Sequence, residues 1–199
     1  AIFFESYKEN TMQKWIIIGI TLLLGACSTQ TGENENKAAP APQRIRPDAY
    51  FQAALSGNLQ HIAHAVAQGT KLAIRNPQGQ TALMLAAFNG HTHLVEWMLA
   101  NGAGLSATDN SGRTALLFAA SGKFPETVQC LIDAGADINT TDSAEHFSAL
   151  MFAASEGNLQ VVKKLLAAGA DKSLKDADGQ TAYDFALQNN HHKVAKLLK

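Results

Sequence analysis

Cysteine is scarce in this 199-residue chain, because Cys27 and Cys130 are the only two and do not make a disulfide framework. An excess of one charge is also missing: 16 basic residues stand against 17 acidic ones, with a formal net charge of -1. Such a chain has no excess positive field to hold a phosphate backbone, so we expect no nucleic-acid partner. Its length and 46% apolar residues predict one folded domain with tails.

Motifs of catalysis are missing as well. The sequence contains no serine nucleophile elbow, no phosphate-binding glycine loop and no zinc-protease helix. His61 and His64 lie three residues apart, but no acidic or thiol ligand lies near them in sequence to complete a metal site. Cys130 falls in an apolar helical pattern, where a cysteine is more often a packed apolar group than a reactive thiol. We therefore predict no catalytic residue, no metal, no cofactor and no small-molecule substrate.

An apolar run near the start is too short to cross a bilayer. Lys14 precedes about ten residues, Trp15 to Leu24, whereas a membrane-spanning helix needs about 20. A basic residue before such a run is typical of an export signal, and a buried core helix is the alternative interpretation. Residues 1–11 carry two glutamates, which are atypical of such a signal. We therefore predict that residues 1–11 are an upstream extension and that residues 12–26 are the signal peptide.

The segment Leu24-Gly25-Ala26-Cys27 closes this run. It resembles the lipobox of bacterial lipoproteins, in which the cysteine is acylated and becomes the mature N-terminus. The resemblance implies a lipid anchor on Cys27 and, because Ser28 stands where an aspartate would favour the inner membrane, a place in the outer membrane facing the periplasm. Residues 27–47 are polar and contain three prolines, which predicts a flexible tether.

A period of 33 to 34 residues runs through the remainder of the chain. A hydroxyl residue, an alanine and a large side chain recur together, as Thr81-Ala82-Leu83, Thr114-Ala115-Leu116, Ser148-Ala149-Leu150 and Thr181-Ala182-Tyr183. Glycines keep the same period, at Gly69, Gly102, Gly135 and Gly169. Each hydroxyl is suited to cap a first helix, and each glycine lies just past a second helix, where a left-handed residue ends it.

The period and these motifs resemble the ankyrin repeat, a β-turn finger followed by two antiparallel helices. The resemblance implies an all-α ankyrin-repeat solenoid over residues 48–199, with about five helix-turn-helix units. The predicted units are 48–76, 77–109, 110–142, 143–176 and 177–199. The family's Thr-Pro-Leu-His motif ends here on Met84, Leu117, Met151 and Asp184 instead of histidine. Apolar packing must therefore replace most of that histidine's hydrogen bonds.

Ankyrin proteins generally bind a partner on the concave face, made of the finger tips and the exposed side of the first helices. By register, the resemblance implies partner-binding positions at Gln78, Gln80, Phe88, Asn89, Asn110, Arg113, His146, Phe147 and Glu156. Phe88 and Phe147 stand where the repeat needs no large side chain, which predicts aromatic anchors of an interface. In the alternative interpretation, irregular fingers fold these rings back onto the stack.

These patterns together predict a membrane-tethered protein-protein interaction module of the bacterial cell envelope. We expect a monomer that holds an unidentified protein partner on its concave face without catalysis. By analogy, its role is that of an immunity protein or of a protector of a periplasmic enzyme. An envelope scaffold or assembly factor is the alternative, and an enzyme is the less favoured one.

Overall fold

The computed structural model describes residues 47–199, so the predicted extension, signal peptide, Cys27 and most of the predicted tether lie outside the described residues. The described part contains ten helices and no β-strand, which confirms the predicted all-α repeat solenoid. The helices are α2 (Pro47–Leu55), α3 (Leu59–Ala67), α4 (Ala82–Phe88), α5 (Thr92–Ala100), α6 (Ala115–Ser121), α7 (Pro125–Asp133), α8 (Ala149–Ser155), α9 (Leu159–Ala167), α10 (Ala182–Gln188) and α11 (His192–Leu198). One pair falls in each predicted unit, with α2 beginning one residue earlier.

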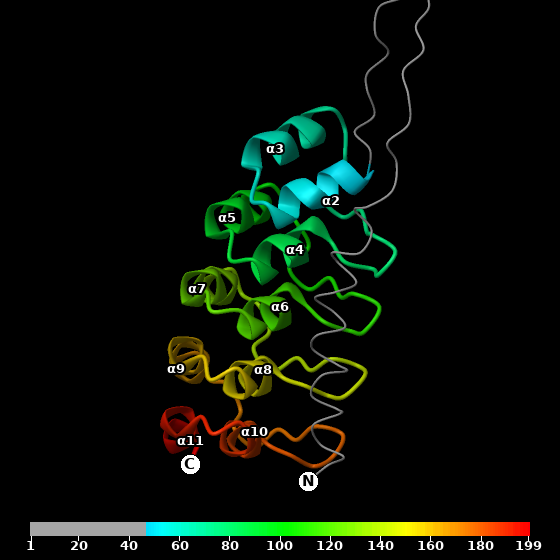
Figure 1. Ribbon diagram of the computed structural model, residues 1–199. Helices are drawn as coiled ribbons and strands as arrows, with labels where there is room; N and C mark the ends of the chain where they lie inside the picture. The colour runs from blue at the N-terminus through cyan, green and yellow to red at the C-terminus, as the bar shows by residue number, and fades with distance from the viewer. Residues whose placement is uncertain (1–46) are drawn as a thin grey trace, which may run out of the picture. The chain divides into compact units, whose positions relative to one another are not determined.

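The helices stack in two columns (Figure 1). The first helix of each pair packs on the first helix of the next, which makes an inner column of α2, α4, α6, α8 and α10. The second helices α3, α5, α7, α9 and α11 form the outer column. Between successive pairs the chain leaves the columns as a narrow loop on the far side of the inner helices, and these loops are the fingers.

The inner helices begin at the predicted hydroxyl caps. The side-chain oxygens of Thr81, Thr114, Ser148 and Thr181 each accept a hydrogen bond from the backbone N–H three residues on. At the position of the family's histidine, the sulfur atoms of Met84 and Met151 accept from the N–H of the cap at 3.3 and 3.4 Å. Both methionines are buried, as is Leu117, so packing replaces the histidine here as predicted.

Small side chains bring the two columns close together. The pairs Ala86-Ala87, Ala119-Ala120 and Ala153-Ala154 are fully buried. They lie in one continuous core with large apolar residues of the outer helices, such as Leu94, Leu131 and Leu165. Because no single repeat buries its own apolar face, each helix pair depends on its neighbours for this core.

Repeat three turns differently between its two helices. The corresponding turns of the other repeats hold a residue in the left-handed region, at Gly57, Gly90, Gly157 and Asn190. Lys123 takes that place in repeat three, where its side chain disfavours a positive φ. The turn instead passes through Gly122 in an extended conformation, with φ -88° and ψ 175°, and Pro125 then begins α7. The exposed residue Phe124 lies at this irregular turn.

Within residues 47–199, none of the helices combines the length and the apolar character needed to cross a bilayer.

Candidate protein-binding face

The fingers and the exposed side of the inner helices make one surface, which we call the finger face. Its four fingers comprise residues 75–80, 108–113, 141–147 and 175–180. Each finger is bonded to the next: Asn110 N–H donates to the Gln78 carbonyl, Ser143 N–H to Ser111, and Ala177 N–H to Glu145, at 2.9 to 3.0 Å. The finger tips therefore form a connected ladder, and a partner meets a surface that is already ordered.

An acidic or amide side chain stabilises each finger from within. Asn76, Asp109 and Asp176 accept backbone N–H bonds from the residues two and four positions later. Asp142 accepts from the backbone N–H groups of Glu145 and Phe147, because the finger 141–147 is one residue longer than the others. The additional residue is accommodated at His146, whose φ of 59° is in the left-handed region and whose side chain is exposed.

Arg113 lies over the middle of the finger face rather than projecting from it. Its guanidinium donates from Nε and one Nη to Oδ2 of Asp109, at 3.0 and 2.8 Å, and its carbon centre lies 4.5 Å from the Phe118 ring centroid. The Phe118 ring in turn makes an edge contact with Phe88, with centroids 6.2 Å apart. A continuous contact thus leads from the second finger to Phe88 on the neighbouring repeat.

Phe147 is folded back onto the stack, as in the alternative interpretation. Its ring packs edge-on against Phe152 at 5.4 Å and against Phe185 of the next repeat at 5.1 Å. Phe147 precedes the cap Ser148, and Phe152 is the fourth residue of α8, so their contact is a hydrophobic staple. The Phe147 ring is half-buried between two repeats, which agrees with the alternative interpretation. Its part in binding stays a prediction.

Phe88 and Phe124 are the large aromatic side chains that the described part leaves most exposed, each at 37%. The Phe124 ring lies against Gly90, so closely that a Cβ on that glycine would meet it at 2.1 Å. In repeats two and five, the ring at this place belongs to His91 or His191, whose Nε2 donates to a carbonyl of the preceding repeat at 2.7 or 3.0 Å. In repeat four, Asn158 stands there and its Nδ2 donates to the Gly122 carbonyl at 2.7 Å. His91 thus has a structural role, whereas Phe124 has no polar side-chain atom to make that bond.

The remaining predicted residues serve the stack in part. The Asn89 amide donates to the Leu55 carbonyl at 2.7 Å, and Asn110 Nδ2 donates to the Pro77 carbonyl at 3.1 Å. Gln80 Oε1 accepts from Asn76 at 2.9 Å. Gln78 and Glu156 are half-buried, and Glu156 lies at the end of α8. The structure places all of them on the finger face or its border, but nothing in these contacts assigns a partner to them.

The sequence analysis did not identify three phenylalanines in the first turn of inner helices, which we call the aromatic floor: Phe118, Phe152 and Phe185. All three stand four residues after a capping hydroxyl, and this fixed offset was visible in the sequence. The residue before each cap reaches over the ring of its own repeat in two cases, Arg113 and Phe147. The staple pattern would therefore have identified the contact of Phe147 with Phe152, whereas Arg113 covers Phe118 through a cation–π contact.

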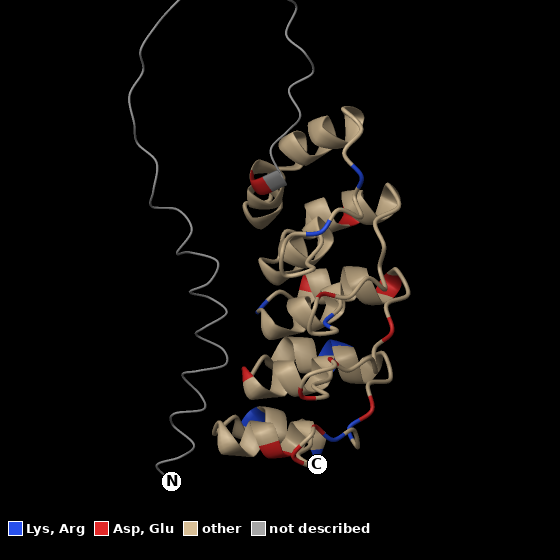
Figure 2. Ribbon diagram, turned by 90° about the vertical axis from the view of Figure 1, so that its right-hand side faces the viewer, with Lys and Arg blue, Asp and Glu red and all other residues tan. Residues whose placement is uncertain are grey.

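The described part shows little that favours chemistry. Within it, no three histidine, cysteine, aspartate or glutamate side chains come together in a group that would hold a metal ion. Burial, and then the nearby carboxylates of Glu96 and Asp133, raise the pKa of the Cys130 thiol. A raised pKa keeps the thiol protonated and so weakly nucleophilic. Figure 2, which looks onto the fingers, shows acidic and basic positions interleaved along the stack rather than a stripe of one sign.

Comparison with known proteins bears on this fold. A family model described as ankyrin repeats, in three copies, matches residues 50–142 and also residues 123–199. The two matches together cover well over half of the chain and extend from α2 to its end. The comparison with curated proteins finds no match.

Proposed function

The chain belongs to the ankyrin-repeat family, whose members are protein-protein interaction modules, and on that premise we propose that it binds one protein partner on the finger face. In this proposal the protein is a lipid-tethered module of the bacterial envelope and acts by binding rather than by catalysis. A partner held in this way is either blocked, as by an immunity protein, or protected, as a periplasmic enzyme would be.

The observation that carries the proposal is the exposed pair of Phe88, at the end of the inner helix α4, and Phe124, at the turn between α6 and α7 that borders the finger face. Aromatic side chains are enriched at the energetic centres of interfaces, because they bury much area at a low entropy cost. Phe124 also stands where three other repeats have His91, Asn158 or His191, so its ring forgoes the hydrogen bond to the preceding repeat that each of these makes. A residue that gives up such a bond and exposes an apolar ring fits selection for binding better than selection for stability.

The envelope part of the proposal rests on the sequence. The apolar run, the lipobox-like segment ending at Cys27 and the proline-containing stretch after it together support a folded domain held at a membrane surface by acyl chains. Labelling cells with a radioactive fatty acid tests this part separately. We expect label on the parent protein and none on a Cys27→Ala variant, and equal labelling of both would contradict the lipid anchor.

Capture of a partner from detergent-solubilised envelope tests the binding proposal. Three full-length proteins are compared: the parent, Phe88→Ala with Phe124→Ala, and Leu197→Ala. Leu197 is 37% exposed, as both phenylalanines are, but it lies on the outer helix α11. Circular dichroism first establishes that all three proteins are folded, and mass spectrometry then identifies the captured proteins.

We expect one stoichiometric partner with the parent and with Leu197→Ala, and its loss from the double phenylalanine variant. Capture by all three would place the binding site elsewhere. Several weakly bound proteins with no dominant one would favour the envelope scaffold over the single-partner module. Metal or turnover assays of the purified protein check the enzyme alternative.

A further inference from the structure

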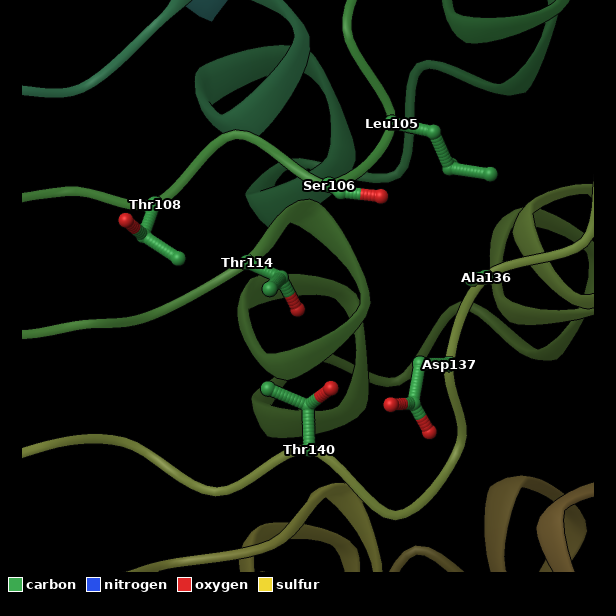
Figure 3. A pocket seen from close by; sticks show the side chains of 7 residues that line it. All are labelled: Leu105, Ser106, Thr108, Thr114, Ala136, Asp137 and Thr140. Atoms are coloured by element: carbon green, nitrogen blue, oxygen red, sulfur yellow. The ribbon is translucent and has the colours of Figure 1, made fainter.

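A cavity of about 150 Å³ lies between repeats two and three, at the base of the fingers (Figure 3). It is lined from repeat two by Leu105, Ser106 and Thr108, and from repeat three by the cap Thr114, Asp137 and Thr140. In Figure 3 the side chains of Thr114, Thr140 and Asp137 converge on one space. The polar lining thus consists of hydroxyl groups and one carboxylate, with no basic side chain.

The cavity exists because the side chains of Thr140 and Thr108 are shorter than those at the same registers of other repeats. Thr140 stands at the register of Ile74 and Leu174, both of which pack against the apolar core in their own repeats. Ala107, at the same register, is also short, but the junction between repeats one and two contains Arg75 at the register of Thr108. The Nη1 of Arg75 donates to the carbonyls of Gly79 and Thr108 across that junction. One repeat further on, threonine replaces the arginine and leaves space.

We propose that this cavity takes the guanidinium group of an arginine side chain from the protein partner. The junction above shows that the repeat geometry accepts a guanidinium from Arg75. At the cavity, the Asp137 carboxylate supplies the opposite charge, at a register where repeat two has Gly104. The hydroxyls of Thr108 and Thr140 supply acceptors for further N–H donors. The proposal rests on the proposed function, since it specifies what the partner brings.

A small probe tests the cavity independently of any partner. Methylguanidinium is titrated into the full-length protein in detergent while amide chemical shifts are followed by NMR. The variants are Asp137→Asn, which removes the charge, and Thr140→Leu, which fills the space as Leu174 does in the next repeat. Asp171→Asn is the matched control, because Asp171 stands at the same register as Asp137 in the next repeat.

We expect saturable shifts centred on Thr108, Asp137 and Thr140, with a dissociation constant of roughly millimolar order for so small a ligand. Asp137→Asn should weaken binding at least about tenfold and Thr140→Leu should abolish it, whereas Asp171→Asn should leave it unchanged. The same shifts with tetramethylammonium would contradict a guanidinium-specific site, and binding that survives both cavity variants would overturn the proposal.

The captured partner gives the second readout. If Asp137→Asn lowers partner affinity and changing one partner arginine to lysine has no further effect in that background, the two residues are coupled. If methylguanidinium binds but no partner is captured, the cavity stands and the proposed function fails. If a partner is captured and neither cavity variant affects probe or partner, the cavity proposal fails while the function stands.

Discussion

At the residue scale, the first repeat contains a buried hydroxyl without a hydrogen-bond partner. Tyr50 is 1% exposed, and no described group bonds its phenolic oxygen. Its register equivalents Leu83, Leu116 and Leu150 are apolar, and Tyr183 is half-buried in the last repeat. The hydroxyl therefore loses its hydration on folding and gains no protein hydrogen bond in return, which weakens a repeat that has only one neighbour.

Tyr50→Phe should therefore stabilise the first repeat. We expect a gain of about 1 kcal/mol in its free energy of unfolding, because an unsatisfied buried polar group costs about 1–3 kcal/mol. Hydrogen exchange of the amides in α2 and α3 measures this repeat directly. Tyr183→Phe is the matched control and should change little. Slower exchange in Tyr183→Phe, or unchanged exchange in Tyr50→Phe, would contradict the account.

Tyr50 also predicts a dependence of stability on alkaline pH. Burial raises the pKa of its phenol from 10.0 to about 12. The folded state therefore disfavours the ionised form, and its stability is complete below pH 10 and falls as the pH rises toward 12. The loss should amount to roughly 2–3 kcal/mol across this window. Urea unfolding of the parent at pH 9 and pH 11 should show a larger decrease than that of Tyr50→Phe, and equal decreases would sink this explanation.

At the element scale, α10 begins with a cap that differs from the other three. Thr181 donates from its N–H and its Oγ1 to Asp184 Oδ2, at 2.8 and 2.7 Å. These bonds, the side-chain bond first and then the backbone bond, lower the pKa of the Asp184 carboxyl. The stabilisation is present above the ordinary aspartate pKa and is lost as pH falls through the lowered one.

Asp184→Leu should thus destabilise the last repeat by about 1 kcal/mol at neutral pH, the typical contribution of a cap. It should also remove part of the acid dependence of exchange in α10 and α11 as the pH falls below the ordinary aspartate pKa of 3.8. Asp178→Asn, an exposed change in the neighbouring finger, serves as the control. Identical acid profiles for parent and Asp184→Leu would show that the cap has no such role.

The turn between α6 and α7 predicts a trade between stability and binding. Phe124→His should let the new imidazole donate to the Phe88 carbonyl, 36 positions earlier, as His91 and His191 do at the same separation. We expect the free energy of unfolding to rise by about 1 kcal/mol and partner binding to weaken. The reciprocal variant His91→Phe should lose about the same stability. Urea unfolding measures the change in stability, and partner capture measures the change in binding. Unchanged capture by Phe124→His would show that Phe124 is not part of the binding site.

The helices and their caps were predictable because they depend on residues close in sequence. Thr81 and its equivalents cap within three residues, and glycines such as Gly102 end helices locally. The orientation of Phe147 was not predictable in the same way, since Phe185 contacts it from the next repeat. The cavity likewise depends on Thr108 and Thr140 coming together across a junction. Contacts between repeats thus escape a reading of one repeat at a time.

At the scale of the whole molecule, the repeat stack separates what holds it together from what a partner can reach. Apolar residues of both columns form a continuous core, and hydrogen bonds connect finger to finger. The finger carboxylates and Arg113 are engaged within the fold. Within residues 47–199, large exposed apolar groups remain in few places, among them Phe88, which contacts Phe118 of the aromatic floor, and Phe124 on the next repeat. The central claim is that a protein partner covers this place.

Photo-cross-linking in the cell envelope tests that claim most directly. A photoreactive phenylalanine is placed at position 88 in one full-length protein and at position 197 of the outer helix α11 in another. We predict a single protein cross-linked at high yield from position 88 and none from position 197. Cross-linking of the same protein from position 197 alone, or none from position 88 in a folded protein, would contradict the account.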